Sequence, residues 1–253
     1  MSAHHEEILE QFTRQAAGYA QSASIRDQDA LDLLVRWSAV TATERVLDVA
    51  CGPGHVVCAF ALVASEAAGV DMTPAMLEQA RRHAAELGVT NARWQLAEIP
   101  PLPWADDSFD VVVTRYAVHH MTDPLAMLRE MVRVCAPGGR VVVCDLALAP
   151  EAVAAFNAMD RLRDPSRVRA FSSDELRELY LQAGLGEPRV TGYTLEGDLD
   201  ALLARSFPAP GGEEEVRCRF HASLDDDHLG VDARRDGERI TYRHPIAVLA
   251  ATV

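Results

Sequence analysis

Two carboxylates and two glycines are spaced as in a ligand-binding turn between a strand and a helix. The apolar run 46–49 is broken only by Asp48, and it leads into Gly52 and Gly54. Because glycine has no side chain, the backbone of such a turn can approach a ligand closely. A second apolar segment ends on Asp71, seventeen residues beyond Gly54. An acid at the end of a second strand can bind the hydroxyls of a ribose, so the pattern predicts a nucleoside ligand.

The same loop distinguishes between two classes of ligand. A dinucleotide site uses the pattern G-x-G-x-x-G and holds a pyrophosphate at the N-terminus of the helix. Here His55-Val56-Val57 follow Gly54, so the third glycine is absent. Asp48 stands just before the loop and suits a ligand that carries an ammonium group better than a pyrophosphate. A nicotinamide dehydrogenase therefore stays open only as an alternative.

Four segments, in order, resemble the motifs of the class I S-adenosylmethionine-dependent methyltransferases of the type 11 group. The first is the loop described above, with Ala50 in place of the usual first glycine. The second is the segment that ends on Asp71. The third, 101–113, is similar to the family's segment before strand four, and the fourth, 129–139, is similar to the helix and Pro-Gly-Gly turn before strand five. Together they span residues 45–146.

The resemblance implies that the chain binds S-adenosylmethionine as its cofactor. It assigns the ribose to Asp71, the adenine edge to the backbone of Ile99, and the adenine amino group to Glu98, where the family usually has aspartate. Backbone carbonyls near Ala50 and Arg115 would accept hydrogen bonds from the ammonium group. The cofactor-binding residues predicted in this way are Asp48, Ala50, Gly52, Gly54, Asp71, Met72, Glu98, Ile99 and Arg115.

Two adjacent histidines, His119 and His120, follow the strand expected at 109–114. They would lie at the carboxyl edge of the sheet, where open α/β folds bind ligands. An imidazole titrates near neutral pH, so either ring could act as a catalytic general base. They could also cap the helix that opens at Asp123-Pro124, or simply pack. No metal site is expected, because adjacent side chains rarely converge on one ion without further ligands.

Two further segments are candidate lids over the site. Segment 11–20, with Phe12 and Tyr19, is similar to the N-terminal helix of the ubiquinone and menaquinone biosynthesis methyltransferases, where a Phe and a Tyr cover the cofactor. The alternative is an ordinary amphipathic helix. The charged segment 161–169 could gate an acceptor pocket, or it could be a solvated run; its four arginines would favour an anionic or carboxylate-bearing acceptor. The predicted substrate and lid residues are Phe12, Tyr19, Tyr116, Arg163 and Asp164.

The composition limits the partners of the chain. Its 253 residues carry a formal net charge of −14, which disfavours nucleic-acid partners. Five cysteines without regular spacing favour reduced thiols and a cytoplasmic protein. No apolar run approaches the roughly 20 residues that cross a bilayer, so no membrane insertion is expected. A homodimer is compatible with the sequence.

The alternation of strand and helix patterns predicts an α/β fold with right-handed crossovers. We expect a doubly wound, Rossmann-like, mostly parallel seven-stranded sheet with an antiparallel last strand. N-terminal lid helices are expected in 1–40 and the methyltransferase domain in 41–253, with an active-site cap at about 151–183. The segment 208–215 reads as a surface loop. Helices are expected at 4–20, 26–40, 55–64, 74–87 and 123–135 and from Ser172, and strands at 45–50, 67–71, 92–97, 109–114, 139–146 and about 240–249.

The predicted function follows from the resemblance and from the histidines. We expect transfer of a methyl group from S-adenosylmethionine to a carbon or oxygen of a small-molecule acceptor, such as a quinol, a phenol or an enol-like metabolite. A protein that keeps the cofactor but catalyses another reaction, such as a cyclisation, is the alternative. A further alternative is a non-enzymatic binding module that keeps the fold. Such a module would be expected to have lost the residues of the cofactor loop, whereas Gly52, Gly54 and Asp71 are all present.

Overall fold

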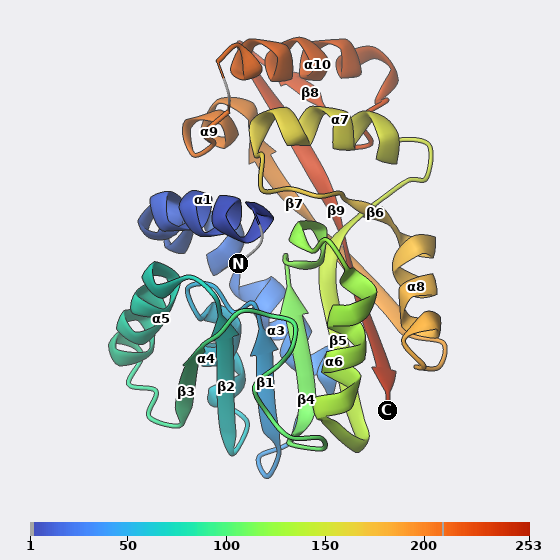
Figure 1. The fold of residues 1–253 in the computed structure, drawn as a ribbon. Coiled ribbons are helices and arrows are strands. Elements are labelled where there is room, and N and C mark those ends of the chain that lie inside the picture. Colours follow the sequence, from blue (N-terminus) through green and yellow to red (C-terminus); the bar gives the residue numbers. More distant parts are fainter. Residues whose placement is uncertain (1–2, 209) are drawn as a thin grey trace.

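The computed structural model describes residues 3–208 and 210–253, which are organised around one mixed sheet (Figure 1). Its strands are β1 Arg45–Val49, β2 Glu66–Asp71, β3 Ala92–Leu96, β4 Phe109–Arg115, β5 Cys135–Leu148, β6 Phe171–Ser172, β7 Arg189–Asp198, β8 Arg234–Asp236 and β9 Arg239–Thr252. The main path runs β3-β2-β1-β4-β5-β9-β7. The strands β1 to β5 are parallel, whereas β9 is antiparallel to both of its neighbours.

The expected α/β sheet with an antiparallel last strand is therefore confirmed, and seven strands lie along its path. The short strands β6 and β8 pair with β5 and β9 outside this path and were not predicted. The strand β5 extends beyond the expected 139–146 at both ends, from Cys135 to Leu148, because Cys135 pairs with Phe109 of β4 and Ala147 and Leu148 pair with β6. Its last residues continue toward the upper part of the molecule in Figure 1.

Helices cover both faces of the sheet and its carboxyl edge. Their bounds are α1 Ala3–Ala20, α2 Ala23–Arg26, α3 Gln28–Ser38, α4 His55–Ala61, α5 Pro74–Glu86, α6 Pro124–Val134, α7 Val153–Arg163, α8 Ser173–Gln182, α9 Leu199–Ala204 and α10 Gly212–Asp226, with a 3₁₀ turn at Val118–His120. Buried residues of α3, α4 and α5 belong to one apolar cluster, and those of α6 and α8 belong to the other. The near-continuous apolar strands are thus buried from both sides, as parallel sheets require.

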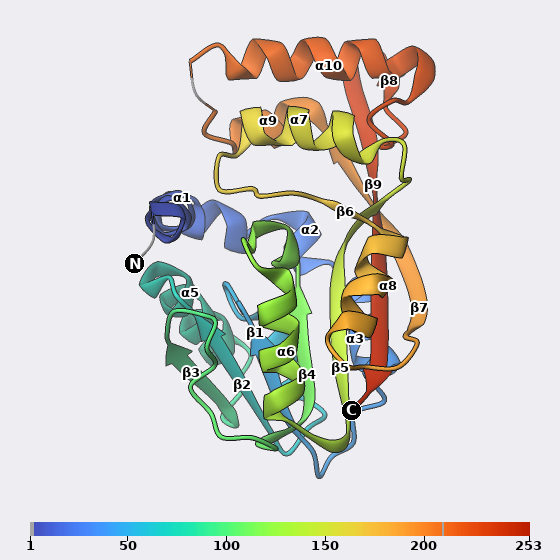
Figure 2. The same cartoon turned by 45° about the vertical axis from the view of Figure 1, so that its right-hand side comes forward.

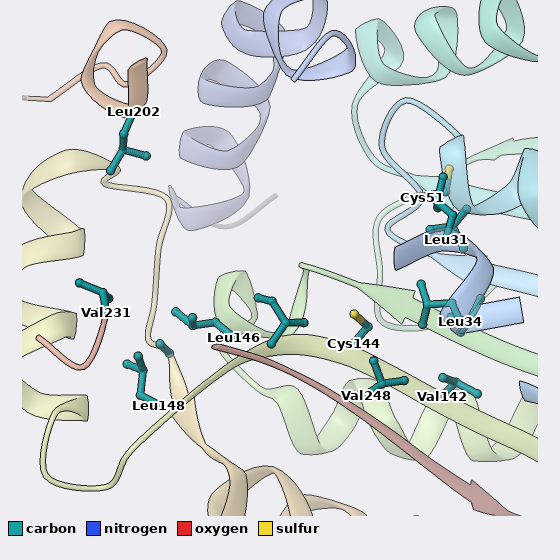
Figure 3. Packing of buried hydrophobic residues seen from close by; sticks show 14 of the residues in the cluster. Leu31, Leu34, Cys51, Val142, Cys144, Leu146, Leu148, Leu202, Val231 and Val248 are labelled. Atoms are coloured by element: carbon teal, nitrogen blue, oxygen red, sulfur yellow. The ribbon is translucent and has the colours of Figure 1, made fainter. Parts of the chain in front are cut away.

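A cap formed by α7, α9 and α10 stands beyond the carboxyl ends of β1 and β4, and α1 lies between the cap and the sheet (Figures 1 and 2). One apolar cluster joins the two parts. Figure 3 shows Val142 in the sheet and Leu148 near the cap on the same strand β5, with Leu202 of α9 and Val231 packed in the same cluster. This shared core holds the cap in a defined position over the sheet.

Several expected elements have different bounds in the structure. The helix expected at 26–40 is α3 at Gln28–Ser38, because Asp27 caps its start and the Asp27 Oδ1 accepts a hydrogen bond from the Ala30 amide at 3.1 Å. The residues before it form the separate short helix α2. The loop expected at 208–215 is also partly wrong, because α10 begins at Gly212 and carries three glutamates in its first turn, where the helix dipole favours acids. Ala209 of that segment lies outside the described residues.

Within the described ranges, no helix combines the length and the apolar character needed to cross a bilayer.

Candidate active site

A cavity of about 410 Å³ opens at the carboxyl ends of β1, β2 and β4, beneath α1. The segments after the three strands supply its floor, and α1 supplies its cover. A volume of this size is typical of small-ligand sites. The cavity brings together eleven of the predicted site residues, Phe12, Tyr19, Asp48, Ala50, Gly52, Asp71, Met72, Ile99, Arg115, Tyr116 and His120.

The Asp71 carboxylate holds the loop after β1 in place. Its Oδ2 accepts a hydrogen bond from the Gly52 amide at 2.8 Å, and its Oδ1 accepts one from the Thr73 amide at 2.8 Å. The parallel pairing of β1 with β2 makes this possible, because it brings the two strand ends side by side. Burial raises the pKa of Asp71, although the amide hydrogen bonds counteract part of this rise. Each carboxylate oxygen keeps a second lone pair that can accept from a ligand hydroxyl.

Asp48 is the buried carboxylate of the cavity that has an unpaired oxygen. Its side chain is 2% exposed, and its Oδ1 has no hydrogen-bond partner within the described part of the chain. Burial and the neighbouring Asp71 raise its pKa well above the usual range, while Arg115 partly offsets them. Burying such a group without a partner costs free energy, so a cationic ligand at this point would relieve an existing penalty.

Arg115 is buried and ties α2 to the end of β4. Its guanidinium donates to the carbonyl oxygen of Ser24 at 2.8 Å and to that of Ile25 at 3.1 Å. It also donates to the hydroxyl of Tyr116 at 3.2 Å, and that hydroxyl lies 2.5 Å from the hydroxyl of Tyr193. The side chain of Arg115 therefore fixes the short helix beside the cavity, a role that the sequence analysis did not assign to it.

Gly54 and Glu98 do not line the cavity. Gly54 has a φ of +80°, and a Cβ at this position would lie 2.6 Å from the Trp94 ring and 2.8 Å from the Ala80 Cβ. It therefore permits close packing of the loop against β3 and α5. Glu98 is half exposed, and its carboxylate lies 3.4 Å from Nδ1 of His5 on α1. Its contact with an adenine amino group stays a prediction.

A second, smaller cavity of about 110 Å³ lies between α1, the end of β4 and the cap. His119 lines this cavity, and its Nδ1 lies 2.5 Å from Oδ1 of Asp145 on β5. Asp145 also accepts hydrogen bonds from the amides of Val118 and Leu146, at 2.8 and 2.7 Å. Burial acts to raise the pKa of Asp145, but His119 and these donors outweigh it and hold the pKa below the usual value. The carboxylate is thus poised to orient the imidazole and stabilise its charged form.

Asp145 is a residue that the sequence analysis missed. The available signal was a single acid inside the apolar run 139–146, because a buried carboxylate needs a partner.

His120 has a different environment from its neighbour. Its Nδ1 lies 3.0 Å from the Ser166 carbonyl oxygen, and its ring packs edge-on against Phe12 at a centroid distance of 5.0 Å. The Nε2 of His4 on α1 lies 2.8 Å from its backbone oxygen. Burial, His119 and Arg167 lower the pKa of His120. The ring is neutral and joins α1 to the segment before β6.

The segment 161–169 is not simply a solvated charged run. Arg163 and Asp164 are only 7% and 4% exposed, and both line the second cavity. Arg163 donates through Nε to Asp160 at 2.7 Å, and the Asp164 carboxylate accepts from the Ser166 hydroxyl at 2.6 Å. Phe12 and Tyr19 of α1 lie between the second cavity and the larger one, and they line both cavities. Their ring centroids are 5.9 Å apart.

No group of three or more His, Cys, Asp and Glu side chains in the described ranges is arranged to hold a metal ion.

The sheet order is the one expected of a methyltransferase, and comparison with known proteins agrees. Residues 41–183 match the family model described as a methyltransferase domain. The chain is 31% identical over 236 residues to the uncharacterized methyltransferase YcgJ of Bacillus subtilis, covering 91% of this chain and 93% of that protein. It is 32% identical over 149 residues to the demethylmenaquinone methyltransferase of Clavibacter sepedonicus, covering 58% of this chain and 60% of that protein.

Solved structures agree with this comparison. The crystal structure of the Bacillus subtilis YcgJ protein superimposes with a TM-score of 0.82 at 29% identity, covering 89% of this chain and 98% of that one. The [4+2]-cyclase SpnF shares the fold, with a TM-score of 0.62 at 21% identity over 89% of this chain and 80% of that one. The chain belongs to the methyltransferase domain family, and it is an S-adenosylmethionine-dependent methyltransferase. The resemblance stated from the sequence is thereby confirmed.

Proposed function

We propose that this methyltransferase binds S-adenosylmethionine in the larger cavity and transfers its methyl group to a carbon or oxygen of a small-molecule acceptor. The observation that carries the proposal is the buried Asp48 carboxylate, which lines the same cavity as Asp71 and leaves one oxygen without a partner in the described ranges. A ligand with both a positive charge and a ribose satisfies the two acids together. Asp48 stabilises the charge, and Asp71 accepts hydrogen bonds from the ribose hydroxyls.

The other cavity residues support the same ligand. Ala50, Gly52, Met72 and Ile99 all line the cavity, and Gly52 adopts a φ of +51°, which keeps the loop backbone open to the ligand. We propose that the backbone at Ala50 receives the ammonium group and that Ile99 meets the adenine edge. Arg115 acts indirectly, because its guanidinium holds α2 against the cavity.

The second cavity receives the acceptor. When bound, S-adenosylmethionine supplies a methyl group on a positively charged sulfur. His119, oriented by Asp145, takes the proton that the acceptor loses when its oxygen or carbon is methylated. Phe12 and Tyr19 of α1 cover the boundary between the cavities and exclude water from it, which favours direct transfer over hydrolysis. Tyr116, which lines both cavities, completes the wall.

The acceptor that fits the wall shared by the two cavities is an aromatic or enol-like molecule, such as a quinol or a phenol. The rings of Phe12, Tyr19 and Tyr116 offer apolar contact, and relatives of this chain are named for a demethylmenaquinone reaction. A reaction other than methylation, such as cyclisation, is the second candidate, because the fold is shared with a [4+2]-cyclase. We further propose a reducing, cytoplasmic setting, which the five free cysteines support.

Titration calorimetry tests the cofactor assignment. We expect the protein to bind S-adenosylmethionine and not NAD, and we expect Asp71→Ala to lose this binding. Asp236→Ala is the matched control, because it removes an exposed acid on β8, which does not line the cavity. A preference for NAD, or equal binding by both variants, would contradict the proposal. Mass spectrometry of products from quinols and phenols then separates methylation, which adds about 14 Da, from a cyclisation, which does not.

A further inference from the structure

Several hydrogen-bond donors that line the second cavity have no acceptor among the described residues. Arg163, Arg167 and Arg205 reach it from the cap, and His244 reaches it from β9. The cavity adjoins the larger one, because Phe12, Tyr19, Ile25, Tyr116 and His120 line both.

The three arginines differ in what they already bind. Arg163 is bound through Nε to Asp160 and through Nη1 to the Ser206 hydroxyl at 3.3 Å. Arg167 reaches the same Asp160 through Nη1 at 3.2 Å, but its Nε is buried and has no hydrogen-bond partner in the described ranges. Arg205 makes no side-chain hydrogen bond or ion pair with any residue that the structure describes. Two donor groups therefore remain for a ligand.

The carboxylates around the cavity do not neutralise these donors. Asp145 is occupied by His119 and three backbone amides. Asp164 accepts from the amide and the hydroxyl of Ser166. Asp160 is shared between Arg163 and Arg167. The guanidinium of Arg205 therefore has no carboxylate partner among the described residues. Burial raises the pKa of Tyr19 and Tyr242 and lowers that of His244, and the positive charge of Arg205 acts to lower all three.

His244 on β9 contributes a further unused group to the lining of this cavity. Its ring lies against Phe156 and Tyr242, at centroid distances of 5.7 and 4.6 Å. Its Nε2 is buried and has no hydrogen-bond partner in the described part of the chain. Burial lowers the pKa of His244 to about 3, so the ring is neutral and can donate one hydrogen bond without adding charge.

We propose that this cavity is an anion subsite for the acceptor, and that its ligand group is a carboxylate. Arg205, the Nε of Arg167 and the Nε2 of His244 are the donors that receive it. A volume of about 110 Å³ accommodates a carboxylate with the adjoining part of a ring, and the rest of the molecule extends along the shared wall toward the larger cavity. A single negative charge fits best, because Asp145 and Asp164 flank the donors. The inference rests on the proposed function: it gives the methyl acceptor a carboxylate beside its hydroxyl or enol.

The subsite is tested by calorimetry on the full chain saturated with S-adenosylhomocysteine. The probes are 2- and 4-hydroxybenzoate, each compared with the neutral hydroxybenzamide of the same shape, and phenyl phosphate as a dianion. We expect at least one hydroxybenzoate to bind about tenfold or more tightly than its amide, as a charge-assisted contact predicts. Arg205→Gln and Arg167→Gln should abolish this preference, and Arg205→Lys should retain part of it.

The matched control is Arg161→Gln, which removes the same charge from an exposed position of the cap outside the cavity. It should leave the preference unchanged. Equal affinity for hydroxybenzoate and amide in the unmodified protein, no hydroxybenzoate binding at millimolar concentration, or tighter binding of phenyl phosphate would each overturn the proposal. So would a preference that survives Arg205→Gln. The affinity for S-adenosylmethionine is measured in parallel: its absence contradicts the proposed function, whereas its retention with no carboxylate preference contradicts the subsite alone.

Discussion

Nδ1 of His119 lies 2.5 Å from Oδ1 of Asp145, and both side chains are almost completely buried, at 4% and 1% exposure. The two residues come from different elements, because His119 lies in the 3₁₀ turn after β4 and Asp145 lies in β5. With Nδ1 committed to the carboxylate, Nε2 is the nitrogen left to exchange a proton with an acceptor. Both histidines line the second cavity, but Nδ1 of His119 faces a carboxylate, whereas Nδ1 of His120 faces the Ser166 carbonyl oxygen. This pair therefore separates the roles of two histidines that look equivalent in the sequence.

The first prediction concerns this pair. We expect His119→Gln to lower kcat by about 10²- to 10⁴-fold, which is the usual contribution of a general base. Asp145→Asn should lower kcat in the same direction, because it no longer orients the ring or stabilises its charge. Neither change should weaken S-adenosylmethionine binding. Turnover with an identified acceptor and calorimetry with the cofactor measure the two effects separately.

His120→Gln is the comparison for that experiment. Its ring joins α1 to the cap, so we expect a loss of stability and a higher KM before any large change in kcat. Loss of kcat in His120→Gln with full activity in His119→Gln would assign the base to the other ring.

The second prediction concerns Asp48. Asp48→Asn removes a buried carboxyl group that can ionise next to a cationic ligand and whose Oδ1 lacks a partner in the described ranges. We expect S-adenosylmethionine, which carries a sulfonium, to bind about tenfold or more weakly, and we expect the uncharged-sulfur product S-adenosylhomocysteine to lose less. The ratio of the two dissociation constants, measured by calorimetry, reports the charge at sulfur. An equal loss for both ligands would show that Asp48 does not sense that charge.

The same substitution should stabilise the protein without ligand. The pKa of Asp48 is raised in the folded state by burial and by Asp71, so the folded state binds the proton more tightly than the unfolded state does. Stability therefore falls as the pH rises above the unfolded pKa of about 3.9. Asp48→Asn should add about 1 kcal/mol to the free energy of unfolding at pH 7, and this gain should disappear below pH ~4. Urea denaturation across this pH range checks the sign.

The third prediction concerns Gly54. Gly54→Ala places a Cβ 2.6 Å from the Trp94 ring at a φ of +80°. We expect a loss of about 2–4 kcal/mol in the free energy of unfolding, from backbone strain and overpacking together. Gly88→Ala is the matched control, because its φ is +68° but no atom lies within 4 Å of the added Cβ. It should cost only the backbone part, about 1–2 kcal/mol. Equal losses in the two variants would rule out the packing role of Gly54.

Parts of the site could be predicted from sequence because they depend on neighbouring residues. Asp48, Gly52 and Asp71 stand at fixed distances from strand ends, and parallel pairing necessarily gathers those ends at one edge. The contact between His119 and Asp145 is of another kind. It depends on the register of β4 with β5, in which Arg115 pairs with Cys144, and short sequence patterns do not determine register across a crossover.

The cap was harder to predict for a physical reason. The first turn of α10 contains Gly212 and three glutamates, which read as a loop until the cap packs the helix against α7. Arg163 and Asp164 read as a solvated run, because charged side chains are rarely buried. Their burial is possible only because Asp160 and Ser166 supply partners, and those partners become visible only when the segment is folded.

The fourth prediction concerns the base of the sheet, far from both cavities. Glu44 stands just before β1, and its carboxylate receives both terminal nitrogens of Arg140 on β5, at 2.6 and 2.8 Å. Arg140 also donates to the Ser38 and Ala39 carbonyl oxygens at the end of α3. Chiefly through the hydrogen bond from Arg140, the pKa of Glu44 is lowered to about 2. The pair therefore clamps α3 and β1 to the middle of the sheet.

A carboxylate whose pKa is lowered by folding stabilises the protein above its unfolded pKa, and this contribution is lost as the pH falls toward the folded pKa. Glu44→Gln should therefore cost about 1–2 kcal/mol at pH 7, and the cost should shrink between pH ~4.5 and about 2. Glu66→Gln is the control, because its ion pair with Arg93, at 3.5 Å, is exposed and should contribute little. Urea denaturation of both variants at several pH values measures the difference. A cost for Glu44→Gln that does not change with pH would show that shape, and not the charge of the pair, holds α3 to the sheet.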